Sequence, residues 1–176
     1  MLAAKKPKAV AGAVLNDIGP RVEKAGFMRI ASYVGKQFPL RDWSDAVAYA
    51  KETNGIVYPK FSEEDWLRFA RRIFNEGPDD KPVFSYDPKI FQPISPLAAV
   101  LAPILAWRAY ERLARVAPVL VVRGELSDIL SLKTVEKMRR RTRAFSFTET
   151  PNVGHAPTLD EPASRQAIGA FLKLVP

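Results

Sequence analysis

Three short segments of this chain have the hydrophobic patterns of β-strands. Residues 10–15 and residues 119–122 are continuous apolar runs, which are typical of strands covered on both faces of a parallel sheet. Residues 144–148 alternate between apolar and polar side chains, which predicts a strand nearer an edge of the sheet. A helical pattern follows each of the last two segments, and this alternation of strand and helix favours parallel strands.

The two helices predicted after the second strand each have one apolar face. The first begins at Ser131 or Thr134, ends at Arg141, and is apolar on one side and basic on the other. The second is capped by Asp160 or Thr158 and extends to Leu174, and Ile168, Phe171 and Leu172 are predicted to face the sheet.

The long segment between the first two strands contains helical patterns and no alternation typical of strands. Asp42 is a predicted helix N-cap, Ser62 and Asp65 form a predicted capping box, and Pro103 is predicted to interrupt a helix. An exposed loop is predicted at residues 77–82. The predicted helices of this segment cover residues 22–36, 43–53, 63–74 and 95–115.

The length of 176 residues and the hydrophobic fraction of 47% fit one domain with a real core. We therefore expect an α/β fold with about three parallel strands, flanking helices and a helical cap insertion. Residues 1–20 and 116–176 are expected to form the core, and residues 21–115 the helical cap subdomain.

Composition excludes several kinds of chemistry. The chain has no cysteine, which removes disulfides, thiolate zinc sites and cysteine nucleophiles, and a single histidine argues against a histidine-rich metal site. No cofactor or metal is therefore expected. The absence of cysteine suits a reducing cytoplasm, and no apolar run approaches the roughly 18 residues that a membrane-spanning helix needs.

The net charge of +8 is partly concentrated in two clusters. Nucleic acid or an anionic membrane would attract such clusters, and nucleic-acid binding would then depend steeply on salt. We favour a solvated helix face and a lysine-rich chain start, because no zinc-finger or RNA-recognition pattern accompanies the charge. The clusters consist of Lys5, Lys6 and Lys8, and of Arg139, Arg140, Arg141 and Arg143.

The candidate chemistry lies in the loops that follow the predicted strands. Asp128 comes a few residues after the second strand, and His155, the only histidine, comes a few residues after the third. Because parallel strands end at the same edge of a sheet, a carboxylate–imidazole contact is expected there. Such a pair can act as a general base and the acid that orients it. Glu125 and Asp17 are the competing carboxylates, although Asp17 also lies in a turn-like sequence that leads into the insert.

Several motifs together resemble the α/β-hydrolase-fold family with a helical cap. The resemblance covers essentially the whole chain, and it implies the acid role for Asp128 and the base role for His155. Its motifs indicate fold and mechanism class but no particular substrate. The matching segments are Val14-Leu-Asn-Asp-Ile-Gly-Pro20, Arg29-Ile-Ala-Ser-Tyr-Val-Gly35, Tyr86-Asp-Pro88, Val119-Leu-Val-Val-Arg-Gly-Glu-Leu-Ser-Asp128 and Gly154-His-Ala-Pro-Thr-Leu-Asp-Glu-Pro162.

The chain departs from the family pattern at its start, where residues 1–7 resemble the end of the helix that follows the nucleophile. It contains no Gly-x-Ser-x-Gly motif. The resemblance thus implies the C-terminal part of a serine-type hydrolase of an ester, lactone or carbon–carbon bond in a small apolar substrate. We expect the chain to be inactive alone, whether it reflects a truncated gene, a mis-called start or a split protein.

The strand at residues 10–15 is then expected to leave an open apolar sheet edge. The alternative function is a non-catalytic or partner-completed protein, which pairs this edge with another chain.

Overall fold

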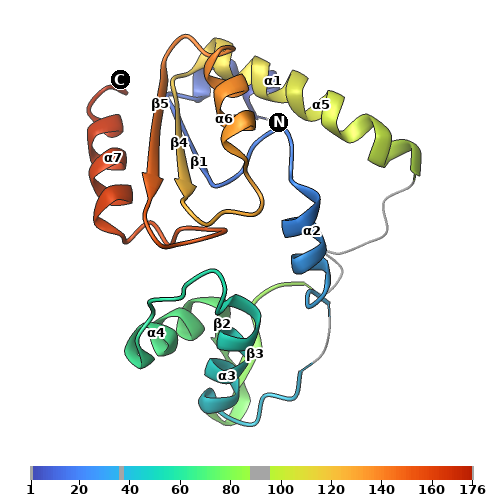
Figure 1. Cartoon of the computed structure of the whole chain (residues 1–176), viewed down its shortest axis with the longest axis vertical. Helices are drawn as coiled ribbons and strands as arrows, with labels where there is room; N and C mark the ends of the chain where they lie inside the picture. Colours follow the sequence, from blue (N-terminus) through green and yellow to red (C-terminus); the bar gives the residue numbers. More distant parts are fainter. Residues whose placement is uncertain (1, 36–37, 88–95, 176) are drawn as a thin grey trace. The chain divides into compact units, whose positions relative to one another are not determined.

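A computed structural model describes residues 2–35, 38–87 and 96–175. The chain divides into two compact units (Figure 1). Met1–Phe27 and Ile94–Pro176 form the core unit, and Met28–Pro93 form the helical unit. The helix Pro96–Val116 therefore lies in the core unit, whereas the sequence analysis placed residues 21–115 in the cap. The predicted element ends at residues 1, 36 and 95 lie outside the described residues, as does Pro88 of the family-like motifs.

The core unit is built on a three-stranded parallel sheet, as predicted. Its strands are β1 (Ala13–Asn16), β4 (Val119–Gly124) and β5 (Phe145–Thr150), in the order β1-β4-β5. Leu15 of β1 pairs with Val121 of β4, which pairs with Phe147 of β5. Every residue of the central strand β4 is buried, whereas β5 is only partly buried, as expected for an edge strand.

The first strand is shorter and more exposed than predicted. It begins at Ala13 rather than at Val10, and Val14 is 37% exposed. The expectation of burial on both faces was wrong for β1, because the strand order makes β1 an edge of this sheet. Upstream of β1 are α1 (Leu2–Lys5) and the short 3₁₀ helix η1 (Pro7–Ala9).

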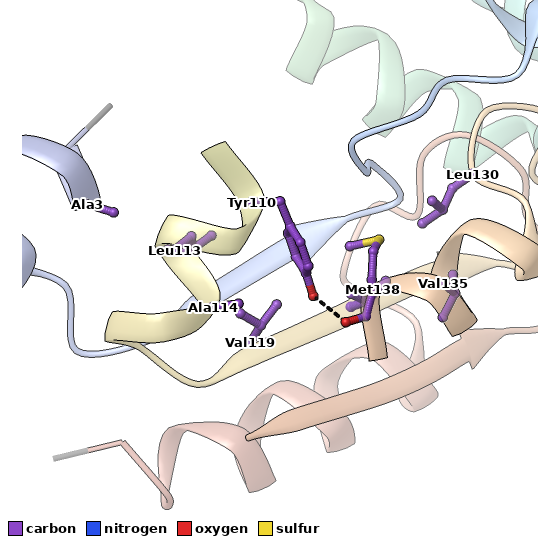
Figure 2. Packing of buried hydrophobic residues seen from close by; sticks show 9 residues of the cluster. Ala3, Tyr110, Leu113, Ala114, Val119, Leu130, Val135 and Met138 are labelled. Carbon is purple, nitrogen blue, oxygen red and sulfur yellow. Dashed lines mark hydrogen bonds between the residues drawn. The ribbon is translucent and has the colours of Figure 1, made fainter. Parts of the chain in front are cut away.

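Helices cover both faces of the sheet. The side chains of β4 alternate, so Val119 and Val121 face one cluster while Leu120 and Val122 face another. Figure 2 shows the first cluster, in which α5 and α6 pack against the sheet. The phenol of Tyr110 there donates a hydrogen bond to the Met138 carbonyl oxygen at 3.2 Å. The helices of the core unit are α5 (Pro96–Val116) and α6 (Leu132–Arg139) on one face and α7 (Pro162–Leu172) on the other.

Two details of the predicted core helices were wrong. Helix α5 continues through Pro103, because a proline removes only one backbone hydrogen bond and the turns on both sides keep theirs. Leu172 is 61% exposed, whereas Phe171 is 3% exposed. Successive helical residues are about 100° apart, and in α7 the buried face includes Phe171 but not Leu172.

The helical unit contains two capped helices and a small hairpin. Asp42 caps α3 (Trp43–Asn54), and Ser62 and Asp65 form the predicted capping box of α4 (Glu63–Ile73). The expectation that this segment lacks strands was wrong, since a two-stranded antiparallel sheet follows α4. Three-residue strands are too short to show an alternating pattern. The remaining elements of this unit are β2 (Phe74–Glu76), η2 (Pro78–Asp80) within the predicted loop, and β3 (Pro82–Phe84). Helix α2 (Lys24–Ala31) begins in the core unit and ends in the helical unit.

We expect helix α3 to lose stability in acid. A hydrogen bond from the Ser44 hydroxyl lowers the pKa of Asp42, and hydrogen bonds from Arg41 lower the pKa of Asp45 from 3.8 to about 2. Because these pKa values fall on folding, the stabilisation is complete above about pH 4 and is lost as the pH falls toward 2. Far-UV circular dichroism should show the loss in thermal scans. The Asp45→Asn variant should lose less over the same range, and an equal loss would contradict the prediction.

Candidate functional site

The loops at the carboxyl ends of the three parallel strands meet around Asp17. This residue directly follows β1, and its backbone N–H donates to the Val122 carbonyl oxygen at 2.7 Å, which extends the pairing with β4. Its φ angle of 51° lies in the left-handed region, which aspartate tolerates better than most residues. The turn leaves Asp17 fully buried.

The Asp17 carboxylate is held by three groups, which come from the end of β4, from the loop that follows β4 and from the loop that follows β5. Its Oδ1 accepts a hydrogen bond from the Gly124 backbone N–H at 3.0 Å, and its Oδ2 accepts one from the Ser127 hydroxyl at 2.6 Å. The imidazole Nδ1 of His155 lies 2.9 Å from Oδ2 and 3.1 Å from the Asp17 carbonyl oxygen. A carbonyl oxygen can only accept, so Nδ1 carries the hydrogen and the neutral ring keeps its lone pair on Nε2.

His155 reaches Asp17 because its loop crosses the end of the central strand. The loop leaves β5, while Asp17 follows β1, and β4 lies between them. A Cβ atom on Gly124 would lie 2.5 Å from the carbonyl oxygens of both Val153 and Gly154, so only glycine lets the loop pass this closely. The side-chain amide of Asn16 also donates to the Pro157 carbonyl oxygen at 2.9 Å. The histidine loop is therefore anchored to both β1 and β4.

The other candidate carboxylates lie in the loop that follows β4. Asp128 is partly buried, and its backbone carbonyl oxygen accepts from the Gly26 N–H at 3.2 Å. The carboxylate that contacts His155 Nδ1 belongs to Asp17, so the acid role of Asp128 stays a prediction. The Glu125 carboxylate accepts from the Asn152 N–H at 2.7 Å and supports the turn after β5.

Sequence reasoning missed two functional neighbours of the pair. Ser127 and Gly124 were not singled out, although both contact the Asp17 carboxylate. The available signal was Arg123-Gly124 at the end of an otherwise apolar run. A charged residue in such a run indicates a buried ionic contact, and a glycine at a strand end indicates a close approach of another backbone.

A cavity of about 1000 Å³ lies in the core unit beside the turn after Asp17. Apolar side chains such as Val22 and Phe27 line it together with Lys133 and Lys137. Neither Asp17 nor His155 lines this cavity, so it is separate from the pair. Among the described residues, no group of three or more histidine, cysteine or acidic side chains could hold a metal ion. Within the same residues, no helix is long and apolar enough to span a membrane.

The fold identifies the class of protein. The chain resembles the crystal structure of an α/β hydrolase from Novosphingobium aromaticivorans, with 41% sequence identity and a TM-score of 0.84. The match covers 99% of this chain and 60% of that one. A putative hydrolase from Rickettsia typhi matches with 26% identity and a TM-score of 0.76, over 99% of this chain and 58% of that chain. The chain therefore belongs to the α/β-hydrolase-fold family and contains part of that fold.

A relative with a more specific name also matches. The chain is 33% identical over 156 residues to a 3-hydroxybutyrate-oligomer hydrolase from Cupriavidus necator. This match covers 85% of the chain and 52% of the relative, so the chain spans about half the length of that protein. No known protein-family profile matches the chain.

Proposed function

We propose that this chain supplies the general base of a serine-type ester hydrolase. The observation that carries the proposal is the contact of 2.9 Å between His155 Nδ1 and the buried Asp17 carboxylate, at the carboxyl ends of parallel strands. The nucleophile is proposed to lie in a segment outside these 176 residues, because they contain no Gly-x-Ser-x-Gly motif. The chain alone is then inactive.

The position of the hydrogen on His155 suits the base role. With Nδ1–H held by Asp17, the Nε2 lone pair can take the proton from a serine hydroxyl as its oxygen attacks the ester carbonyl carbon. The imidazolium then gives this proton to the leaving alkoxide as the C–O bond breaks. A water molecule, deprotonated by the same Nε2, then attacks the acyl-enzyme. The bond to the serine oxygen breaks, the acid leaves, and the imidazolium returns its proton to the serine oxygen. The buried carboxylate stabilises the imidazolium in both steps.

Two carboxylates compete for the orienting role. Asp17 is favoured by its direct contact with His155 in this structure. Asp128 is favoured by the resemblance of its loop to the family motif, in which it takes the acid role. We propose Asp17 as the orienting group in the arrangement described here and Asp128 as the second candidate.

The proposed substrates are short oligomers of 3-hydroxybutyrate or similar small apolar esters. The support is the Cupriavidus necator relative, whose name specifies hydrolysis of such oligomers. Units of 3-hydroxybutyrate are joined by ester bonds, which attack by a serine hydroxyl can cleave. An ester is therefore favoured over the lactone and carbon–carbon bonds that the same fold could process.

A chimera tests the proposal. The segment of the Novosphingobium aromaticivorans hydrolase that this chain does not match is joined to residues 1–176, which are 41% identical to the matched part of that hydrolase. We expect the chimera to hydrolyse two substrates, p-nitrophenyl butyrate and the 3-hydroxybutyrate dimer. The isolated chain should show no hydrolysis of either substrate above background. The chimera carrying His155→Gln is the matched control and should also be inactive. A folded chimera without esterase activity, or activity that survives His155→Gln, would overturn the proposal.

The second candidate is a non-catalytic protein that completes its sheet with a partner chain. The observation that favours it is the edge position of β1, where Val14 and Ile18 are 37% and 49% exposed. A small apolar groove lined by Leu15, Ala106 and Tyr110 lies beside this edge. A folded but inactive chimera, together with an isolated chain that self-associates through β1, would favour this candidate.

A further inference from the structure

Arg123 is a buried cation near the end of the central strand. Its side chain is 8% exposed, and its guanidinium bonds to a carboxylate and three carbonyl oxygens. Nε donates to the Leu130 carbonyl oxygen at 2.6 Å, and Nη2 donates to that of Ser127 at 3.3 Å. Nη1 donates to the Glu125 carbonyl oxygen at 3.3 Å and to the Glu149 carboxylate at 2.6 Å. All three carbonyls belong to the loop that follows β4.

Ser127 links this loop to the catalytic pair. Its hydroxyl oxygen accepts hydrogen bonds from the Ile129 and Leu130 backbone N–H groups at 3.2 and 3.0 Å. The hydroxyl hydrogen is therefore directed at Asp17 Oδ2, the same oxygen that faces His155 Nδ1. The 125–130 loop thus holds one of the two oxygens of the Asp17 carboxylate, the one that faces His155.

We infer that Arg123 is a positioning residue, which holds the 125–130 loop so that Ser127 and Asp17 keep His155 in its Nδ1–H form. The inference rests on the proposed function, because it concerns the proposed general base. Arg123 would act only through the loop, since its described hydrogen bonds go to the loop and to Glu149.

Stability alone does not account for this arginine. Burying a charge is costly, and an apolar residue of similar volume often serves a protein interior as well as a buried ion pair does. Glu149 lies directly opposite Arg123 on β5, so the ion pair compensates the charge. The three carbonyl contacts need the planar fork of a guanidinium, which presents five N–H donors in fixed directions. A lysine ammonium has the charge but not this geometry.

The single histidine makes the test direct, because the imidazole region of a ¹H–¹⁵N spectrum then reports only His155. In the wild-type chain we expect the Nδ1–H tautomer. In Arg123→Gln we expect the Nδ1–H signal to be lost and the Nε2–H form to become the major neutral form. Arg123→Lys should not restore the signal, whereas a role limited to the ion pair with Glu149 predicts rescue by lysine.

Two further variants keep the result interpretable. Arg141→Gln removes another arginine–glutamate pair of the core unit, with Glu111, and should leave the His155 spectrum unchanged. Ser127→Ala removes the hydrogen bond from the Ser127 hydroxyl to Asp17 but keeps every carbonyl oxygen that Arg123 contacts. His155 should lose its Nδ1–H signal in this variant as well. An unchanged His155 spectrum in Arg123→Gln would overturn the inference. If that variant does not fold, an unchanged spectrum in Ser127→Ala would do so.

The chimera supplies a kinetic measurement. We expect Arg123→Gln to lower kcat by about 10²-fold with little change in KM, because the base is misplaced while substrate contacts remain. The tautomer measurement needs only the isolated chain. An inactive chimera would therefore overturn the proposed hydrolase function, while the His155 spectra would still decide the role of Arg123.

Discussion

In the chimera, Asp17→Asn is expected to lower kcat by about 10⁴-fold, the scale of an orienting carboxylate that is replaced by its amide. Oδ1 accepts from the Gly124 N–H, and Oδ2 faces both Ser127 and His155. An asparagine has only one oxygen, so its NH₂ group must face one of these sides. If it faces His155, the ring must accept on Nδ1 and carry its hydrogen on Nε2. The imidazole can then no longer take a proton from the nucleophile.

Asp128→Asn is the competing variant, and kcat of both proteins on p-nitrophenyl butyrate decides between them. Glu125→Gln is the matched control, because its side chain can still accept from the Asn152 N–H, and it should stay near wild type. A loss of about 10⁴-fold in Asp128→Asn with only a modest loss in Asp17→Asn would contradict the Asp17 assignment. It would return the orienting role to Asp128, as the family resemblance implies.

Gly124→Ala is expected to destabilise the chain by about 1–3 kcal/mol, the usual cost of forcing an extra methyl group into a packed site. The new Cβ would lie 2.5 Å from the Val153 and Gly154 carbonyl oxygens, and these backbone atoms cannot rotate away as a side chain can. The histidine loop must therefore shift away from β4. Chemical denaturation should show the loss of stability, and the His155 spectrum should lose its Nδ1–H signal.

Gly169→Ala is the control for this substitution. Gly169 lies inside α7, and a Cβ atom there would have no neighbour within 4 Å. Alanine should therefore stabilise the helix by about 0.5–1 kcal/mol, without effect on His155. Equal stabilities of Gly124→Ala and wild type, with an unchanged histidine spectrum, would show that the loop does not depend on this close approach.

Local patterns predicted many of the elements because each pattern reflects a local constraint. The apolar run at residues 119–122 became the fully buried centre of the sheet, and the capping residues Asp42 and Ser62 open the helices that follow them. The errors arose where structure outside the local pattern decided the outcome. Pro103 lies within a continuous helix, and Val14 is exposed because β1 is an edge strand.

The sequence by itself determined the parallel α/β core. It also placed His155 and the carboxylates Asp17 and Asp128 in loops at the carboxyl ends of the strands. Those conclusions follow from strand periodicity and from the fact that parallel strands end on the same side. Only the tertiary structure decided which carboxylate faces His155. The strand order puts β4 between the loops of Asp17 and His155. Because glycine has no side chain, Gly124 lets the histidine loop cross the end of that strand. Such a contact depends on backbones distant in sequence, which no local pattern encodes.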